Sequence, residues 1–375
     1  MSFGDLVIED TTLRDGEQTP GVAFGYEDKL RVFRALVAVG LRWIEAGIPA
    51  MGGDELRALR QMLAECGETT VVAWNRGVVE DVEQSLREGF QAIHIGLPAS
   101  DVLLRGSVAK DRKWLLQRAR ELIGRAKDAG AFVSISAEDA GRTELGALVE
   151  YAMTVAEAGA DRLRLSDTVG VMTPEGYGER VQAVREATDI AIQCHCHNDF
   201  GLAVANTLAG LRAGATQFHV TVNGIGERAG MPDLGQVSLA LRCLYGYDLG
   251  LRSKRFRTLS LLVSQLTGVQ SPPWQPVVGA NVFAHESGIH VKGVLRDPKT
   301  FEPFEPDLVG AERTLLLGKH SGRTLIRSLL ESDGHKPSDE DLTACLATVR
   351  ARATADGGRR VALGQLRQIY EEVTG

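Results

Sequence analysis

The sequence has few cysteines, no long hydrophobic run and no excess of positive charge. Its five cysteines are odd in number and scattered, which argues against a disulfide scaffold. No apolar run approaches the roughly 20 residues that a membrane span requires. Residues 1–5 contain neither the basic region nor the apolar region of a signal peptide. From these absences we expect a cytoplasmic protein that does not bind membranes.

The overall charge is acidic, with a formal net charge of −7 and a pI of about 5.7. Such a balance predicts no basic surface for nucleic acid or for an anionic membrane. The 375 residues are 44% hydrophobic and 24% charged, which is ordinary for a globular protein with a full core and room for more than one domain.

Strand-like and helix-like patterns alternate with a period of roughly 25–30 residues. Strands are predicted at 6–9, 43–46, 70–74, 92–97, 132–137, 162–165, 191–197 and 217–223, and helices at 26–39, 54–64, 78–87, 112–129, 143–158, 174–187, 201–213 and 234–244. Eight such units in about 245 residues predict a (β/α)8 TIM barrel. The alternative is a doubly wound open sheet, but the count of eight and the lack of a glycine-rich loop after the first strand favour the barrel.

The alternation stops near residue 249, and a proline-rich stretch follows at 271–276. We therefore predict a catalytic barrel at 1–262 and a mostly helical accessory domain at 263–375. Within the accessory domain we predict an irregular linker and lid segment at 271–322 and a helical tail at 323–375.

Two histidines alternate along the seventh predicted strand. His195 and His197 are two residues apart, so on a strand they point to the same face. Asp15 follows the first strand, which in a closed barrel lies two strands away. The three side chains would make a set of catalytic ligands for Mg²⁺, Mn²⁺ or Zn²⁺, without choosing among these ions. The alternative is a pair of hydrogen-bonded core histidines, and Cys194 and Cys196, on the other face, are predicted to pack in the core.

Arg14 lies beside the predicted metal ligands, where it would bind a carboxylate or offset a developing oxyanion. The alternative for Arg14 is a structural ion pair with Glu45 or Asp167. Every predicted strand also carries polar residues at its carboxyl end, where TIM-barrel active sites lie. These residues are Gln18, Glu45, Asn75, Arg76, His94, Ser134, Ser136, Glu138, Asp167, Thr168, Asn198, Asp199, Asn223, Glu227 and Arg228.

Glu138 is a candidate general base close to the predicted metal. Its alternative is an ion pair with Arg142 or Arg162. His94 is either a hydrogen-bonded core residue or a member of the site. The candidate substrate-binding residues are Arg14, Gln18, Glu45, His94, Ser136 and Thr168.

Two segments, 12–21 and 195–203, resemble the motifs of the DRE-TIM metallolyase superfamily, and five more resemble its Claisen-condensing branch of 2-isopropylmalate, homocitrate and citramalate synthases. These five are 137–140, 166–170, 223–230, 285–290 and 317–322. Segments 44–52, 72–76 and 277–290 are similar to the short homocitrate synthases of nitrogenase-cofactor assembly. The chain stops where isopropylmalate synthases continue into a leucine-binding domain, so no such domain is expected.

The resemblance implies that an α-keto acid chelates the metal held by Asp15, His195 and His197, while Arg14 and Thr168 hold its charged groups. It implies that Glu138 and His290 deprotonate acetyl-CoA, with His290 supplied by the partner subunit of a homodimer. The favoured acceptor is 2-oxoglutarate, which would give homocitrate. The alternatives are 3-phosphonopyruvate giving 2-phosphonomethylmalate, 2-oxoisovalerate giving 2-isopropylmalate, and pyruvate giving citramalate.

Three positions depart from the family pattern. Met231 stands where many of these synthases have an asparagine near the metal, and Phe301 stands where some have a tyrosine. Ser134 stands where the lysine-pathway homocitrate synthases have an arginine for the distal carboxylate. The sequence therefore leaves the group that recognises the tail of the keto acid unidentified.

Overall fold

The computed structural model describes residues 3–355 and 361–375. The chain forms two compact units, 1–271 and 272–375. The predicted boundary at 262/263 falls inside helix α10 (Phe256–Thr267), so the division in the structure comes nine residues later. No helix in the described part of the chain is long and apolar enough to cross a membrane.

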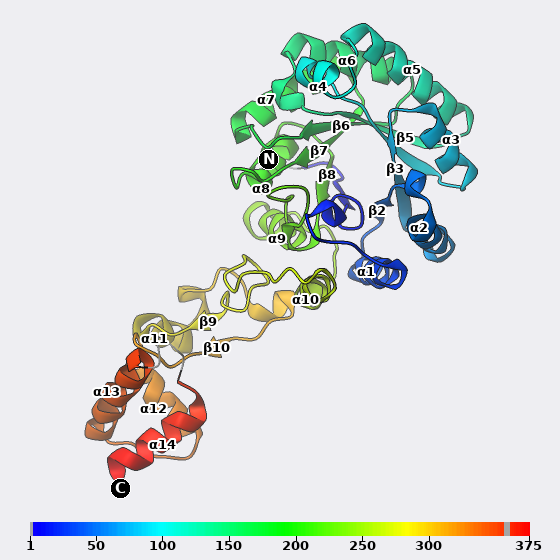
Figure 1. The fold of residues 1–375 in the computed structure, drawn as a ribbon. Coiled ribbons are helices and arrows are strands. Elements are labelled where there is room, and N and C mark those ends of the chain that lie inside the picture. The colour runs from blue at the N-terminus through cyan, green and yellow to red at the C-terminus, as the bar shows by residue number, and fades with distance from the viewer. Residues whose placement is uncertain (1–2, 356–360) are drawn as a thin grey trace. The chain divides into compact units, whose positions relative to one another are not determined.

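Eight parallel strands close into a barrel in the order of the sequence, as predicted (Figure 1). The strand β1 pairs with both β2 and β8, which closes the sheet. β8 lies between β1, which precedes Asp15, and β7, which carries His195. The two strands are therefore two apart, as predicted. The strands are β1 (Val7–Asp10), β2 (Trp43–Gly47), β3 (Thr70–Arg76), β4 (Ala92–Gly96), β5 (Phe132–Ala137), β6 (Arg162–Asp167), β7 (Ala191–Cys196) and β8 (Gln217–Val220).

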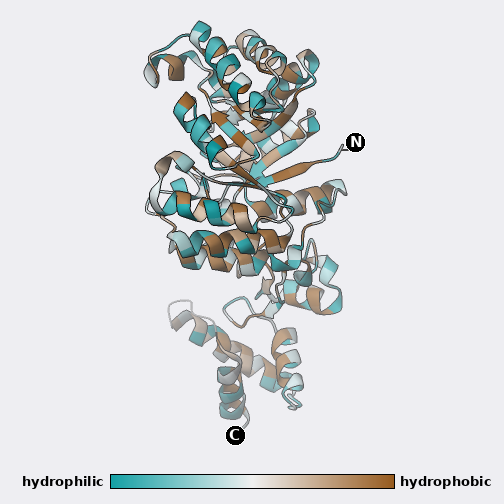
Figure 2. Ribbon diagram, turned by 90° about the vertical axis from the view of Figure 1, so that its right-hand side faces the viewer, coloured by the Kyte–Doolittle hydropathy of each residue, from teal (hydrophilic) through white to brown (hydrophobic). Residues whose placement is uncertain are grey.

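A ring of helices surrounds the strands, and the barrel helices carry hydrophobic and hydrophilic residues on different sides (Figures 1 and 2). This pattern lets each helix pack its apolar face against the sheet. The helices are α1 (Tyr26–Val39), α2 (Gly53–Glu65), α3 (Val79–Arg87), α4 (Asp101–Gly106), α5 (Arg112–Asp128), α6 (Leu145–Glu157), α7 (Pro174–Ala187), α8 (Ala203–Arg212), α9 (Leu234–Tyr245) and α10. The short helix α4, between β4 and α5, was not predicted.

Local sequence signals set the ends of these helices. Thr173 caps α7 by accepting a hydrogen bond from Gly176, and Pro174 occupies the first turn, where its missing N–H is no loss. Gly40 ends α1 with φ of 104°, a conformation that strains other residues. Short 3-10 helices also occur: η1 (Gly16–Gln18), η2 (Pro49–Met51), η3 (Ala140–Arg142), η4 (Val222–Gly224), η5 (Ser253–Arg255), η6 (Pro298–Thr300) and η7 (Pro306–Val309).

The interior of the barrel is charged. Arg162 and Arg164 are at most 1% exposed, and each forms an ion pair across the barrel, Arg162 with Glu9 at 2.5 Å and Arg164 with Glu45 at 2.7 Å. Buried charges are tolerated when they are paired and hydrogen-bonded. This network of ion pairs lies inside the barrel, beneath the polar residues at the carboxyl ends of the strands.

The apolar faces of the strands point outward to the helices. Leu163 and Leu165 alternate with the arginines of β6, and both leucines are fully buried. Cys194 and Cys196 are also fully buried and unbridged, as predicted for packing residues of β7.

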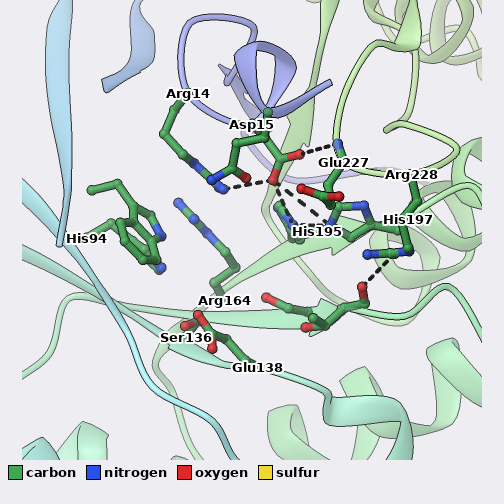
Figure 3. Close-up of a pocket in the computed structure, with 14 residues that line it drawn as sticks. Arg14, Asp15, His94, Ser136, Glu138, Arg164, His195, His197, Glu227 and Arg228 are labelled. Carbon is green, nitrogen blue, oxygen red and sulfur yellow. Dashed lines mark hydrogen bonds and ion pairs between the residues drawn. The ribbon is translucent and has the colours of Figure 1, made fainter. Parts of the chain in front are cut away.

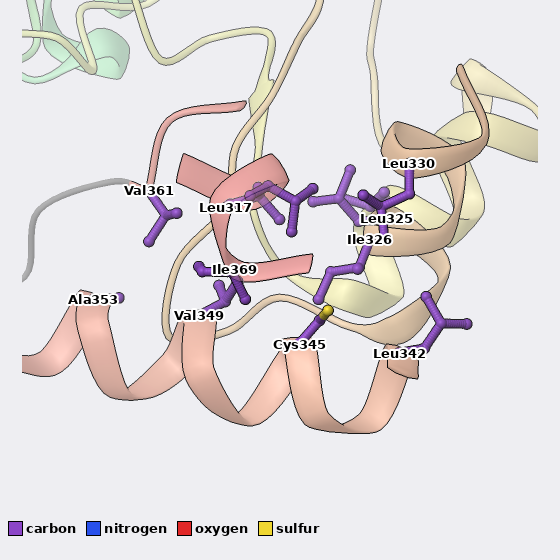
Figure 4. Close-up of a cluster of buried hydrophobic side chains, with 12 residues drawn as sticks. Leu317, Leu325, Ile326, Leu330, Leu342, Cys345, Val349, Ala353, Val361 and Ile369 are labelled. Carbon is purple, nitrogen blue, oxygen red and sulfur yellow. The ribbon is translucent and has the colours of Figure 1, made fainter. Parts of the chain in front are cut away.

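The second unit has its own apolar core, in which Leu325, Ile326 and Leu330 meet Cys345 and Ile369 (Figure 4). Its elements are β9 (Ala284–His285), α11 (Gly288–Arg296), β10 (Thr314–Leu315), α12 (Arg323–Ser332), α13 (Asp339–Ala355) and α14 (Leu363–Thr374). The predicted irregular segment at 271–322 therefore contains a helix and the parallel pair β9–β10. The predicted tail at 323–375 is helical where described, but it includes 356–360, which lie outside the described residues.

Candidate active site

A cavity of about 190 Å³ opens at the carboxyl ends of the barrel strands (Figure 3). This volume suits a small organic acid. The cavity lies where TIM-barrel enzymes place their chemistry. Its lining residues are Arg14, Asp15, Gln18, Trp74, His94, Ser136, Glu138, Arg164, Ser166, Thr168, His195, His197, Glu227 and Arg228.

Asp15, His195 and His197 converge on one point of this cavity (Figure 3). The Nε2 atoms of the two histidines lie 3.3 Å apart, and Asp15 Oδ2 lies 3.7 Å from His195 Nε2 and 4.0 Å from His197 Nε2. A point equidistant from the three atoms is about 2.1 Å from each, the ligand distance of Zn²⁺ or Mg²⁺. The donor set therefore fits a divalent cation.

Hydrogen bonds below the site fix which nitrogen of His195 faces that point. Arg162 and His219 hold the pKa of Glu9 at about 2 against the opposing effect of burial, so Glu9 is ionised and accepts from His219 Nε2 at 2.9 Å. Burial, followed by the charge of Arg164, lowers the pKa of His219 to about 4, so this ring is neutral. His219 Nδ1 must then accept, and His195 Nδ1 donates to it at 2.9 Å. His195 Nε2 is left with a lone pair for a metal, because a neutral ring carries one N–H.

This chain of bonds yields a first prediction. Replacing His219 with phenylalanine should weaken divalent-metal binding by about 10- to 100-fold, because the orientation of His195 would lose its support. Calorimetric titration of metal-free protein measures the change. His285→Gln is the matched control, since it removes another buried histidine paired with a carboxylate, 3.0 Å from Glu302, in the second unit. Unchanged metal affinity in His219→Phe would contradict this role.

Arg14 fits both interpretations offered by the sequence, since it faces the cavity where substrate would bind and also forms structural ion pairs. It lines the cavity, and its Nε donates to Glu45 Oε2 at 2.5 Å while Nη1 donates to Asp15 Oδ2 at 2.8 Å. Although burial opposes the charge, Glu45 and Asp15 raise the pKa of Arg14. Glu45, predicted to bind substrate, is fully buried behind Arg14 and does not line the cavity. It holds the guanidinium in place instead.

Glu138 lies at the opposite wall from the candidate metal ligands (Figure 3). Burial raises the pKa of its carboxyl, and Arg14 and Arg164 oppose that shift. Gly96 makes room for it, because a Cβ at this position would lie 2.7 Å from Glu138 Oε1 and 2.7 Å from the Trp74 ring. A carboxyl with a raised pKa in a cavity has the properties of a general base.

Neither Arg142 nor Arg162, the two arginines considered as structural partners, forms an ion pair with Glu138. Arg142 pairs with Asp139 at 2.8 Å, and Arg162 pairs with Glu9. The side chain of Glu138 therefore remains available to the cavity.

The mouth of the cavity is held by Arg228, which donates to Asp199 at 2.8 Å and to the Thr168 carbonyl at 2.7 Å. Thr168 Oγ1 accepts from the Asp139 N–H, which leaves its hydroxyl hydrogen for a ligand. Glu227 also lines the mouth, and its N–H lies 3.4 Å from Asp15 Oδ1.

The structure brings together eleven of the predicted residues at the cavity: Arg14, Asp15, Gln18, His94, Ser136, Glu138, Thr168, His195, His197, Glu227 and Arg228. Arg76 instead pairs with Asp81, and Asn75 bonds backbone carbonyls and Ser85. Sequence reasoning missed Trp74, Arg164 and Ser166. The alternation of β6, with Arg164 and Ser166 on one face and leucines on the other, was the available signal for two of them.

The departures from the family pattern take defined positions. Met231 is 2% exposed and packs beside Gly226, outside the cavity lining. In the second unit, His290 is exposed on α11 and stacks on Phe301, with ring centroids 4.1 Å apart. A phenyl ring there can orient the imidazole of His290 but has no proton to transfer.

The barrel and its site define the class of protein. Residues 5–263 match the HMGL-like family, and residues 277–357 match the homocitrate synthase post-HMGL domain. The chain belongs to the HMGL-like family.

Two curated relatives of this chain are synthases. A 2-phosphonomethylmalate synthase of Streptomyces rubellomurinus is 58% identical over 98% of this chain and 98% of its own. Homocitrate synthase 1 of Nostoc is 41% identical over 93% of this chain and 92% of its own. The solved hydroxymethylglutaryl-CoA lyase of Pseudomonas aeruginosa has a TM-score of 0.64 at 21% identity, over 72% of this chain and 96% of its own, which is a likeness of fold. The chain is an enzyme of the homocitrate synthase-like group.

Proposed function

We propose that this enzyme condenses acetyl-CoA with an α-keto acid in a divalent-metal-dependent reaction. The carrying observation is the convergence of Asp15, His195 and His197 in one small cavity with Arg14 and the raised-pKa carboxyl of Glu138. Mg²⁺, Mn²⁺ and Zn²⁺ all suit the donor set.

The proposed acceptor is 3-phosphonopyruvate. The 58% identity over nearly the whole of both chains to a 2-phosphonomethylmalate synthase supports this choice. Joining an acetyl unit to the keto carbon of 3-phosphonopyruvate gives the product in that name. The sequence motifs favoured 2-oxoglutarate, and this acid remains the second candidate because of the post-HMGL domain and the 41% identical homocitrate synthase.

The chain's own groups divide the work of the reaction. Arg14 would hold the carboxylate of the keto acid, and Glu138 would take a proton from the acetyl methyl group. The resulting carbanion equivalent forms a bond to the keto carbon, and the former keto oxygen gains a proton. Water then cleaves the thioester and releases the thiol of CoA. When bound, the cation would polarise the keto group and make its carbon electrophilic.

A panel of acceptors tests the assignment through thiol release from acetyl-CoA. We expect the highest kcat/KM with 3-phosphonopyruvate, compared with 2-oxoglutarate, pyruvate, oxaloacetate and 2-oxoisovalerate. A clear preference for 2-oxoglutarate would move the enzyme to homocitrate formation while leaving the reaction class in place. Thiol release with none of the five acids would count against the proposed reaction.

We also propose a homodimer in which α11 of one subunit supplies His290 to the site of the other. The support is that His290 is exposed, and that it is held by stacking on Phe301 instead of by burial. His290 would assist Glu138 at the acetyl group.

Subunit mixing tests this arrangement. Glu138→Ala and His290→Ala proteins should each be nearly inactive, yet their mixture should recover up to about a quarter of wild-type activity. With random exchange half of the dimers are mixed, and each mixed dimer has one intact site. The control is Glu138→Ala mixed with the double variant, which contains no intact Glu138. Failure to recover activity after verified exchange would contradict the shared site.

A further inference from the structure

The floor of the cavity is lined by His94 of β4, Ser136 of β5 and Arg164 of β6. Ser134 of β5 does not line the cavity but lies 2.8 Å from His94 Nδ1, and we call these four residues the pocket floor. All four are at most 1% exposed. Neighbouring strands pair these residues, with His94 opposite Ser134 and Ser136 opposite Arg164. The sequence left the group that recognises the tail of the keto acid unidentified, and the pocket floor lies in the same cavity as the metal ligands.

The hydrogen bonds of Ser134 define the tautomer of His94. Ser134 Oγ accepts from Arg162 Nε at 2.9 Å and lies 2.8 Å from His94 Nδ1. Its single hydroxyl hydrogen has no other acceptor among the described residues, so it is donated to His94 Nδ1. Burial, followed by the charge of Arg164, lowers the pKa of His94 well below its ordinary value, so the ring is neutral. Its one hydrogen is then on Nε2.

That Nε2–H has no partner. His94 Nε2 is buried and makes no hydrogen bond within the described part of the chain, although His94 lines the cavity. A buried donor left unpaired destabilises the folded protein. Such an atom at the wall of a cavity points to an acceptor on a ligand.

Arg164 offers a second donor. Its Nε donates to Gln193 at 2.7 Å, and its Nη2 donates to Glu45 at 2.7 Å and to Glu9 at 3.4 Å. Nη1 has no hydrogen-bond partner among residues 3–355 and 361–375, and Arg164 lines the cavity between Arg14 and His94 (Figure 3). Ser136 is a third donor. Its Oγ accepts from the Leu97 N–H at 3.2 Å, and its hydroxyl hydrogen has only a long 3.5 Å contact to the Ile95 carbonyl.

Buried charges surround the cavity. Arg162 and Arg164 pair with Glu9 and Glu45, and Arg14 pairs with Glu45 and Asp15. The carboxyl of Glu138 also lies near Arg14 and Arg164. A divalent cation held by Asp15 would take up part of the negative charge that offsets these arginines, so an anion in the cavity would then restore the balance.

We propose that Arg164, His94 and Ser136 form the subsite for a tetrahedral, doubly charged tail, the phosphonate of 3-phosphonopyruvate. Three donors from three adjacent strands match the three oxygens of a phosphonate, whereas a carboxylate offers two oxygens and one charge. The proposal rests on the proposed function, because it assumes that the keto end of the acid is held at the metal ligands. It makes the pocket floor a determinant of acceptor specificity.

The test compares an acceptor that has a charged tail with one that lacks it. His94→Phe keeps a ring of similar size but removes the Nε2–H. It should lower kcat/KM for 3-phosphonopyruvate by about 20- to 100-fold, because hydrogen bonds to charged groups are among the strongest in proteins. Turnover of pyruvate, whose methyl group needs no donor, should change by less than about 3-fold. Ser136→Ala should act in the same direction with a smaller effect, and His94→Gln, which retains an N–H, should recover part of the loss.

Arg76→Met is the matched control. Arg76 ends β3 at the same end of the barrel, but it pairs with Asp81 outside the cavity, so both acceptors should be used as by wild type. Arg164→Lys is a harsher test, because it disturbs the ion pairs with Glu9 and Glu45. Its folding is checked by thermal unfolding before its kinetics are compared with those of His94→Phe.

Binding without acetyl-CoA provides an independent measurement. Calorimetry of metal-loaded protein should show that His94→Phe weakens 3-phosphonopyruvate far more than pyruvate. Equal losses for the two acids, or a larger loss for 2-oxoglutarate than for 3-phosphonopyruvate, would overturn the subsite. These outcomes are separate from a failure of the proposed function, in which wild-type protein releases no thiol with any acceptor.

Discussion

Replacing Asp15 with asparagine should remove stoichiometric divalent metal from the protein and lower kcat/KM by about 1,000-fold or more. The substitution keeps the shape of the side chain but removes the negative charge that faces His195 and His197 at 3.7 and 4.0 Å. Arg14 would lose its 2.8 Å ion-pair partner at the same time, which leaves its positive charge uncompensated beside the metal position. Metal content, measured by inductively coupled plasma mass spectrometry, reports the loss independently of activity.

Asp199→Asn is the matched control for this substitution. Asp199 is also a carboxylate at the mouth of the barrel, but it pairs with Arg228 and is not among the residues that line the cavity. Its metal content should equal that of wild type. Retention of one equivalent of metal by Asp15→Asn would contradict the proposed ligand set.

The second large effect is expected from Glu138→Gln, which should lower kcat by about 100- to 10,000-fold, the usual contribution of a general base. Metal content and binding of the keto acid should be retained, because Glu138 lies across the cavity from the proposed metal ligands (Figure 3). Glu150→Gln, on the exposed side of α6 in the same strand–helix unit, is the matched control and should be fully active.

The pH profile separates a base from a structural residue. Burial raises the pKa of Glu138, and only the deprotonated form can accept a proton. The kcat/KM of wild type should therefore fall as the pH drops through this raised pKa, at a higher pH than for an ordinary glutamate. The same acidic limb should be missing from the residual activity of Glu138→Gln. An unchanged limb in that variant would assign it to another group.

The network below the cavity explains why parts of the site escaped prediction. Periodicity identified the eight strands, and the spacing of His195 and His197 with Asp15 identified the candidate metal ligands. Arginine in a strand more often indicates a solvent-facing side chain, so Arg164 was not assigned to the cavity. Its burial follows from Glu9 and Glu45, which come from strands far away in the sequence and meet it only when the barrel closes.

Glu45 is a second residue whose role could not be decided from the sequence alone. Its position on β2 was predicted, and an ion pair with Arg14 was given as an alternative to substrate binding by that arginine. Whether it touches substrate or supports Arg14 depends on the depth of its layer in the barrel, which the sequence does not encode locally. Trp74 was missed for a related reason, because tryptophan is common in apolar cores as well as in sites. Ser166 was missed because a single serine on a strand gives no local sign of which polar groups it will meet.

Analysis of the condensation product is the decisive test of the proposed reaction. Wild-type enzyme is incubated with acetyl-CoA, 3-phosphonopyruvate and Mg²⁺ or Mn²⁺, and free thiol is counted against new phosphonate seen by phosphorus NMR. We expect one thiol for each molecule of 2-phosphonomethylmalate, no product after chelation of the metal, and recovery of activity when metal is returned. Thiol release that is independent of the keto acid, or product formation that survives complete removal of the metal, would contradict the proposed reaction.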